Sequence, residues 1–502
     1  MNKKNILICI FIFITILSII IVKPLNDLDE IWNYNTARAV SEGLIPYKDI
    51  SMITTPLLPI ITALFLKIIA NELIISRILA AILWTGIIYT TYKILKQLIK
   101  EENICLILAS LIGILLRDIY CIDYNITVLF IALIILYQEI KNISVQNKKN
   151  DILVGILAGL AICTKHSIGA ILAFIVVIYK LLFVENKEQF KQYIKIAITR
   201  IIGILIPVII LFAYLVITGA LQKFINYAIL GIKTFSNNIP YISLFYSSKI
   251  EIKILSIAVP ITIMIIAIAL VITKIRKKEN KNTSILLTLL IYSLSIIIVM
   301  YPISDEIHFL IGSLISIIGL IYIIYMTSKK IYDKIKWKNK YKIYKIITLL
   351  IWLIIFSVIS AKSIDNIYKF IKVEKNTQIE HYKNIEIQEH LRQRLTNLNE
   401  YITEKEKQGK KVYILDAEAA IYMIPLDKYN KDYDMFLKGN IGKDGEQGQI
   451  QKIKKSESDV IYLIRKENIR ANWQTPTQVV QHIRENLNKI EEIEIYEAYT
   501  NR

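Results

Sequence analysis

The chain has little cysteine and no common nucleotide-binding motif. Only four of its 502 residues are cysteines, and all four lie within or at the ends of apolar segments: Cys9, Cys105, Cys121 and Cys163. The polar C-terminal part has none, so no disulfide framework holds it together. The glycine-rich stretch 438–448 matches neither a Walker loop nor a dinucleotide fingerprint, and we assign it no phosphate role. There is also no internal repeat, which excludes a repeat architecture.

Long apolar segments are what the chain has in abundance. Apolar residues make up 54% of the sequence, and most fall in uncharged runs of roughly 17 to 25 residues, long enough to cross a bilayer as a helix. Isoleucine is frequent and favours strands, but in lipid the backbone must satisfy its own hydrogen bonds, which selects helices. We therefore expect an α-helical polytopic membrane protein with about eleven spans. They are 6–22, 73–95, 104–116, 126–140, 152–164, 168–184, 201–218, 254–272, 285–300, 309–326 and 346–359.

The first of these segments predicts a retained span. It has no small-residue cleavage site before the acidic loop that follows, so it does not look like a removed signal peptide. The segment 56–70 is apolar but short and is interrupted by Pro56 and Pro59. We expect it to lie along the membrane surface as an interfacial helix.

The net charge of +19 reflects lysine and arginine clusters in alternate loops. The positive-inside rule makes these loops cytoplasmic, together with the N-terminus. The intervening loops and the C-terminus are then outside, and the protein is a multi-pass protein of the cell membrane. The basic residues can contact anionic headgroups, so the charge requires no nucleic-acid partner. The clusters lie at 93–100, 141–149, 187–200, 274–278 and 329–345.

The composition changes near residue 362, which predicts two domains. Residues 1–362 form the membrane domain, with a first outer loop at 24–72, and residues 363–502 form a small extracytoplasmic α/β domain. In the second domain, helical periodicity covers 385–407 and 477–490. Short apolar strands are expected at 411–416, 459–464 and 494–499.

The first outer loop contains the most informative acidic residues. Asp27 and Glu30 are three residues apart at the start of a helical pattern, which is typical of a capping box. Asp29 has no such capping role, although an acid in a first helical turn also gains from the helix dipole. A carboxylate held at a membrane surface can instead act as a general base on an acceptor hydroxyl. Asp29 is therefore our candidate base.

Four cationic or titratable residues lie at the outer ends of predicted spans. Ionisable groups at membrane depth are costly and are functional candidates by default, and cations at this height would stabilise the phosphate of a lipid-linked leaving group. The four are Arg117, Lys165, His166 and His308. The alternatives are that Lys165 snorkels to the interface and that the turn 301–308 is an ordinary capped loop.

A metal site is a further possibility. Asp29, Asp305 and His308 would provide carboxylate and imidazole ligands, but no ligand spacing in the sequence demands a divalent metal. We therefore assign no metal ligands and no firm cofactor.

With these residues in view, the chain resembles the GT-C superfamily of polytopic glycosyltransferases, in particular the protein O-mannosyltransferase and lipid A aminoarabinose transferase type. The resemblance covers roughly residues 6–326. It rests on Asp29-Glu30, Ala37-Arg38, the stretches 43–49 and 56–59, Gly159 to Lys165, and Tyr301-Pro302 with His308. It implies that Asp29 is the catalytic base and that the donor is a polyprenyl-phosphate sugar, and we count the adjacent Glu30 as a second catalytic candidate. It also implies that Lys165 and His308 contact the donor phosphate, and we add His166, Arg117, Arg38 and Tyr301 as substrate-binding candidates.

The resulting hypothesis is a membrane glycosyltransferase that moves a sugar to an extracytoplasmic glycan, lipid or protein. One alternative is a transporter or flippase of lipid-linked glycans, in which charged residues should line a path at mid-membrane depth. Most ionisable residues lie at the outer ends of spans, which favours surface chemistry. A non-catalytic membrane anchor is the second alternative.

Overall fold

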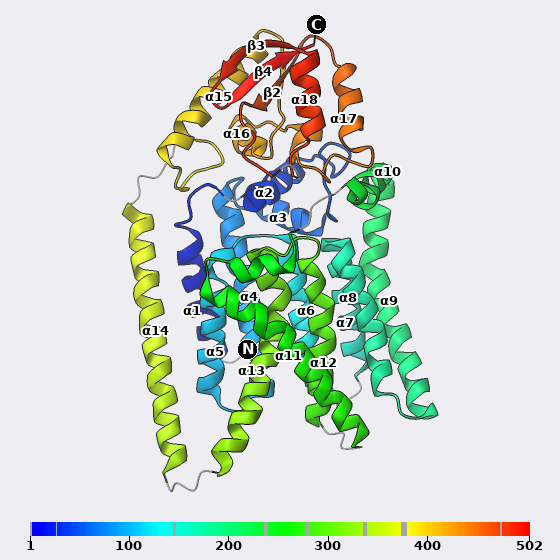
Figure 1. Cartoon of the computed structure of the whole chain (residues 1–502), viewed down its shortest axis with the longest axis vertical. Coiled ribbons are helices and arrows are strands. Elements are labelled where there is room, and N and C mark those ends of the chain that lie inside the picture. The colour runs from blue at the N-terminus through cyan, green and yellow to red at the C-terminus, as the bar shows by residue number, and fades with distance from the viewer. Residues whose placement is uncertain are drawn as a thin grey trace.

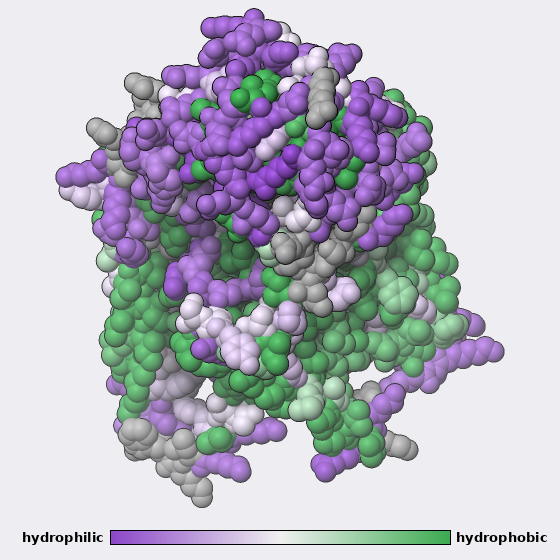
Figure 2. All heavy atoms as spheres, turned by 45° about the horizontal axis from the view of Figure 1, so that its top comes forward, coloured by the Kyte–Doolittle hydropathy of each residue, from purple (hydrophilic) through white to green (hydrophobic). Residues whose placement is uncertain are grey.

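The computed structural model describes residues 3–26, 28–143, 147–234, 239–276, 281–334, 339–372, 379–471 and 474–501. Long helices form a bundle, and a smaller domain that contains the C-terminus covers one end of it (Figure 1). The exposed surface of this domain is mainly hydrophilic, whereas the bundle is mainly hydrophobic (Figure 2). The protein is therefore a helical polytopic membrane protein with a polar domain at one end, as predicted.

Each predicted span coincides with a helix. By length and composition, nine helical segments among the described residues can cross a membrane, including 166–183 and 281–300, where a 3-10 turn extends α8 or α12. The predicted count of about eleven is higher because it includes α5 and α7, which have only 14 and 17 residues. Helix α5 is followed by a 3-10 turn that begins at Arg117. Helix α7 begins with a polar turn. The helices are α1 (Lys3–Ile20), α4 (Leu73–Leu98), α5 (Glu102–Leu115), α6 (Tyr124–Lys141), α7 (Lys148–Thr164), α8 (His166–Ile178), α9 (Lys187–Ile217), α11 (Ile250–Ile275), α12 (Lys281–Ile297), α13 (Glu306–Lys334) and α14 (Lys340–Lys372).

Helices α7 and α9 approach each other closely at glycines. A Cβ atom at Gly155 would lie 2.3 Å from the carbonyl oxygen of Arg200 and 3.0 Å from the Cα atom of Gly203. One turn further along α7, a Cβ at Gly159 would lie 2.5 Å from the carbonyl oxygen of Ile204. This small-residue spacing is a common way for membrane helices to bring their backbones together. It fixes the position of the end of α7, where Lys165 follows.

The first loop forms two short helices between the bundle and the C-terminal domain, α2 (Leu28–Ser41) and α3 (Leu57–Ile68) (Figure 1). Helix α3 has 12 residues, is too short to be counted among the spans and packs on α2. The expectation that the segment 56–70 does not cross the bilayer agrees with this arrangement.

The C-terminal domain contains a four-stranded mixed sheet in the order β1-β2-β4-β3. Strand β1 is parallel to β2, and the other pairs are antiparallel. The predicted helix 477–490 is too long, because β3 begins at Asn488, and neither β3 nor α17 was predicted. The elements are α15 (Glu389–Lys407), β1 (Lys411–Ile414), α16 (Ala419–Met423), α17 (Gly445–Lys454), β2 (Val460–Arg465), α18 (Thr477–Asn486), β3 (Asn488–Ile493) and β4 (Tyr496–Thr500).

The two faces of this sheet belong to different cores. Successive residues of a strand point to opposite faces, and in β2 Tyr462 and Ile464 pack with α17 and α18 inside the domain. On the other face, Ile461 and Leu463 join a core that also contains Ile31 of α2. The C-terminal domain therefore shares one of its two cores with the first loop, which holds the domain against the candidate site.

Candidate active site

Asp29 lies in the first turn of α2 and lines a small cavity. The cavity measures about 20 Å³, roughly the space needed by one water molecule. Its other walls come from α2, from α3 and the loop before it, from the start of α6 and from the C-terminal domain. They are Trp32, Asn33, Thr36, Met52, Ile53, Thr54, Pro59, Tyr124 and Met435. The first loop, the bundle and the C-terminal domain all contribute to the surroundings of Asp29.

The neighbouring acid, Glu30, has a structural partner. Its two carboxylate oxygens accept hydrogen bonds of 3.0 and 2.9 Å from the guanidinium of Arg77 in α4. Glu30 is 3% exposed and Arg77 is fully buried. Arg77 also donates to the carbonyl oxygens of Lys23 and Pro24. The Glu30 carboxylate therefore ties α2 to α4. The predicted capping box depends on Asp27, which lies outside the described residues, and stays a prediction.

Lys165 lies in the short connection between α7 and α8. Its Nζ donates a 2.7 Å hydrogen bond to Oδ1 of Asn125 and lies 4.8 Å from the centre of the Tyr124 ring. The carboxylates of Asp123 and Asp29 both act on this ammonium group electrostatically. Because Tyr124 also lines the Asp29 cavity, it connects the predicted base with the predicted phosphate contact.

A second carboxylate, Asp123, lies beside Lys165. It caps α6 by accepting hydrogen bonds from the backbone N–H groups of Asn125 (2.6 Å) and Ile126 (3.3 Å). Burial raises the pKa of the Asp123 carboxyl, while Lys165 and His308 act in the opposite direction. Asp123 and Asn125 were not predicted as site residues. The sequence signal that could have identified them is Asp-Tyr-Asn directly before an apolar run. The same pattern is typical of an ordinary helix start, so it does not by itself indicate a functional site.

His308 approaches the same site from the first turn of α13. Its Nδ1 lies 2.8 Å from Oδ1 of Asp305, which also accepts a hydrogen bond from the backbone N–H of His308. Asp305 thereby fixes the ring and leaves Nε2 as the nitrogen to present to a ligand. His308 and Lys165 both act electrostatically on the Asp123 carboxyl, so both belong to the surroundings of this carboxylate. The structure thus brings Asp29, Lys165 and His308 into one region.

Arg38, a predicted substrate contact, holds the C-terminal domain instead. Its fully buried guanidinium donates to the carbonyl oxygen of Lys428 at 2.7 Å and lies 3.3 Å from Asp427. It also stacks over the ring of Tyr429, 4.1 Å from the ring centre. These contacts occupy Arg38 in the junction between α2 and the domain.

The three remaining candidates do not line the Asp29 cavity. Tyr301 is 76% exposed. Arg117 pairs with Asp118 at 3.5 Å and lines a separate groove. His166 lies edge-on to the ring of Phe224, 6.4 Å away, and within the described part of the chain neither ring nitrogen has a hydrogen-bond partner.

The structure places one group of three potential metal ligands close together among the residues it describes: Glu380, His381 and Asp427. His381 Nε2 lies 2.5 Å from Oδ1 of Asp427, and Nδ1 lies 2.6 Å from the carbonyl oxygen of Asn71. Arg38 also pairs with Asp427. Protein partners therefore already engage His381 and Asp427. The predicted ligand set of Asp29, Asp305 and His308 is not such a group.

Comparison with solved structures identifies the fold. The chain is similar to ArnT from Cupriavidus metallidurans in the apo state, with a TM-score of 0.56 and 10% sequence identity over 99% of this chain and 97% of that one. It is also similar to ArnT from the same organism bound to undecaprenyl phosphate, with a TM-score of 0.55, the same identity and the same coverage. No protein-family model matches the sequence, and no curated protein matches it either. The likeness confirms the predicted resemblance at the level of the fold.

Proposed function

We propose that the protein is a membrane glycosyltransferase that transfers a sugar from a polyprenyl-phosphate donor to an acceptor, with Asp29 as the general base. The observation that carries the proposal is that Tyr124 lines the Asp29 cavity and also contacts Lys165, while His308 and Lys165 both act on Asp123. Two supports are independent of each other. One is this geometry, and the other is a fold shared over nearly the whole chain with a protein solved in complex with undecaprenyl phosphate.

The proposed reaction uses these groups as follows. Asp29 removes the proton of the acceptor hydroxyl as its oxygen bonds to the anomeric carbon of the sugar. The bond between that carbon and the phosphate oxygen breaks, and its electron pair remains on the polyprenyl phosphate. Lys165 and Nε2 of His308 stabilise the charge that develops on the phosphate oxygens. Asp123 and Asn125 act as positioning residues for Lys165.

Substrate binding requires the site to open. A cavity of about 20 Å³ is far smaller than the several hundred Å³ of a typical ligand site. The parts of the wall that lie outside helices are the segment 52–54 and Met435. We therefore propose that this segment and the domain loop around Met435 move when donor and acceptor bind, so that the C-terminal domain takes part in acceptor access.

The charge distribution supports an extracytoplasmic site. The described parts of the five lysine-rich segments lie near the end of the bundle away from the C-terminal domain, where α13 ends and α14 begins (Figure 1). Under the positive-inside rule this end faces the cytoplasm. Asp29 and the C-terminal domain would then face outside, where the acceptor is expected.

The two alternatives receive less support. A transporter needs a charged path through the membrane, but the charges at the opposite end pair with one another. Arg200 lies 2.7 Å from Glu139 and 2.8 Å from Asp151, and Lys180 lies 3.1 Å from Glu139, so two cations face two carboxylates. A non-catalytic anchor predicts no carboxylate near Lys165, whereas Asp29 and Asp123 both act on it.

The test is transfer from radiolabelled polyprenyl-phosphate sugars by purified protein carrying Asp29→Asn. Loss of a general base is expected to reduce the rate by roughly 10² to 10⁴-fold, with membrane insertion and thermal midpoint unchanged. The matched control is Asp49→Asn, which changes an exposed acid in the same loop that does not line the cavity. Full activity of Asp29→Asn would refute the assignment of the base.

A further inference from the structure

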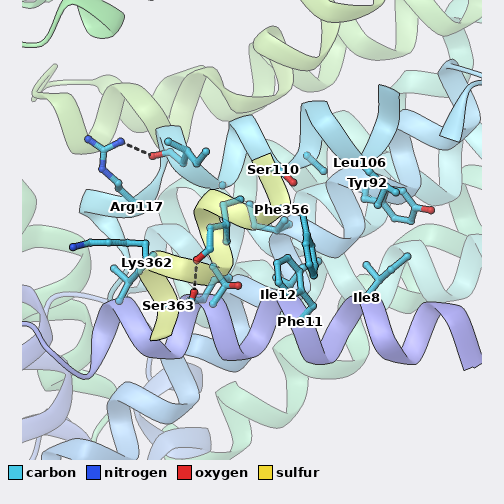
Figure 3. Close-up of a pocket in the computed structure, with 18 of the residues that line it drawn as sticks. Ile8, Phe11, Ile12, Tyr92, Leu106, Ser110, Arg117, Phe356, Lys362 and Ser363 are labelled. Atoms are coloured by element: carbon cyan, nitrogen blue, oxygen red, sulfur yellow. Dashed lines mark hydrogen bonds between the residues drawn. The ribbon is translucent and has the colours of Figure 1, made fainter. Parts of the chain in front are cut away.

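An apolar groove of about 500 Å³ runs between α1, α5 and α14. Its walls include Ile8, Phe11 and Ile12 of α1, Leu106 of α5 and Phe356 of α14 (Figure 3). We call it the α1–α14 groove. It shares no lining residue with the Asp29 cavity. A donor must bring its phosphate to Lys165, so this groove is a separate feature from the proposed donor site.

Helix α14 stands at the edge of the bundle and connects it to the C-terminal domain (Figure 1). Its main partners are α1 and α5, and none of its most apolar stretch is buried inside the protein. It touches α1 where Phe356 stacks on Phe11, with ring centres 4.6 Å apart. Empty apolar space would forfeit dispersion contacts along both walls. A hydrocarbon chain from the surrounding bilayer would restore them.

The groove also has a polar end. Arg117 and Lys362 lie at the same end of the groove, away from the labelled apolar side chains (Figure 3). It is the end at which α14 leads to the C-terminal domain (Figure 1). Their side chains are 49% and 63% exposed, so both can contact a headgroup. The third cation of the lining, Lys4, lies at the opposite end and pairs with Glu102 at 2.7 Å.

The polar end carries an excess of positive charge. Four cations share three carboxylates there. The pairs are Arg117–Asp118 (3.5 Å), Lys249–Asp118 (2.7 Å), Lys249–Glu306 (3.2 Å), Lys362–Asp365 (3.0 Å) and Lys369–Asp365 (3.0 Å). Exposed ion pairs of this kind are weak. A phosphate can therefore bind Arg117 and Lys362 without breaking a strong ion pair. Its negative charge is complementary to the excess positive charge at this end of the groove.

We propose that the α1–α14 groove binds an anionic glycerophospholipid, with one acyl chain between α1 and α14 and the phosphate between Arg117 and Lys362. The bound lipid packs the otherwise loosely held α14 against the bundle and so stabilises the attachment of the C-terminal domain. This inference does not depend on the proposed transferase activity.

The experiment is a lipid titration of the delipidated full-length protein, followed by native mass spectrometry. Phosphatidylglycerol is expected to bind more tightly than phosphatidylcholine. In the double variant Arg117→Gln/Lys362→Gln, affinity for phosphatidylglycerol should fall about thirtyfold. Each basic residue near an anionic headgroup contributes roughly fivefold to affinity, and two such contributions multiply. The matched control Lys4→Gln removes the cation at the other end of the same groove and should bind like the wild type.

A second variant keeps both cations and fills the apolar part. Ser110 lines the groove on α5 (Figure 3), and Ser110→Trp should reduce binding of both lipids. The thermal midpoint without added lipid shows whether each variant is folded. The proposal is overturned if phosphatidylcholine binds as well as phosphatidylglycerol or if the double variant binds like the wild type. Recovery of polyprenyl phosphate, rather than phospholipid, from native membranes would also overturn it.

Discussion

At the residue scale, two adjacent acids of α2 have separate roles. Asp29 lines the cavity, whereas Glu30 is buried against Arg77. Glu30→Gln removes the carboxylate charge and leaves Arg77 buried with an uncompensated charge. Breaking a buried pair in this way costs about 3 to 5 kcal/mol, so the thermal midpoint in detergent should fall markedly. Transfer measured well below that midpoint should persist, because Glu30 pairs with Arg77 and does not line the Asp29 cavity. Asp29→Asn should do the reverse, leaving the thermal midpoint unchanged and strongly reducing transfer.

A second residue-scale prediction concerns Lys165. Replacing it with glutamine keeps a donor for Asn125 but removes the charge proposed to face the donor phosphate. A hydrogen bond involving a charged group contributes about 1.5 to 3 kcal/mol, so kcat/KM for the lipid donor should fall roughly 10- to 100-fold. Lys67→Gln, at an exposed position of α3, serves as the control. If the kinetics of Lys165→Gln match those of this control, Lys165 does not contact the phosphate.

At the element scale, the contact between α7 and α9 positions Lys165. Gly155→Val would place side-chain atoms against the backbone of α9, where a Cβ already lies 2.3 Å from a carbonyl oxygen. Overpacking of this kind costs about 1 to 3 kcal/mol and should displace the end of α7. Since a shift of about 1 Å can cost roughly 100-fold in rate, transfer should fall even in the folded protein.

The control for this helix contact is Gly319→Ala on α13. The nearest atom to its Cβ is the terminal Cδ1 of Ile266, at 3.3 Å, and a flexible side chain can move aside. Its thermal midpoint and transfer rate should therefore stay close to those of the wild type. Equal effects of the two substitutions would show that close α7–α9 packing is not what positions Lys165.

The sequence predicts the elements better than the pairs between them. Each expected span is helical because lipid leaves the backbone no other partner. Asp29 and Lys165 could be found because polar residues stand out next to apolar runs. The pairing of Glu30 with Arg77 joins residues 47 positions apart and depends on how α2 packs on α4. No local pattern contains that information, and the same holds for the core shared between Ile31 and the sheet.

At the scale of the whole molecule, the C-terminal domain is joined to the helix that carries the proposed base. Trp32 donates to the carbonyl oxygen of Ala417 at 2.9 Å, and Asn35 donates to Asp434 at 3.4 Å. The residue after Asp434, Met435, lines the Asp29 cavity. Docking of the domain and closure of the cavity therefore involve the same short loop.

This junction should respond to pH. Burial raises the pKa of Asp434 to about 7, with a smaller contribution from Asp432, while hydrogen bonds from Asn430 and Asn35 and the charge of Arg38 oppose the rise. Between the ordinary value of about 4 and this one, the folded protein binds more protons than the unfolded chain. Its stability should therefore decrease as the pH rises from about 4 to about 7.

Asp434→Asn tests this dependence, because it removes the titration and keeps an oxygen for the two hydrogen bonds. The variant should match the wild type below about pH 4, and its advantage should grow to about 4 kcal/mol at pH 8. Thermal midpoints across this range provide the measurement. In the control Asp432→Asn, Lys452 holds the pKa of the replaced carboxyl low despite burial, so stability should fall by a similar amount at pH 5 and pH 8. A pH profile of Asp434→Asn parallel to that of the wild type would show that Asp434 does not control the junction.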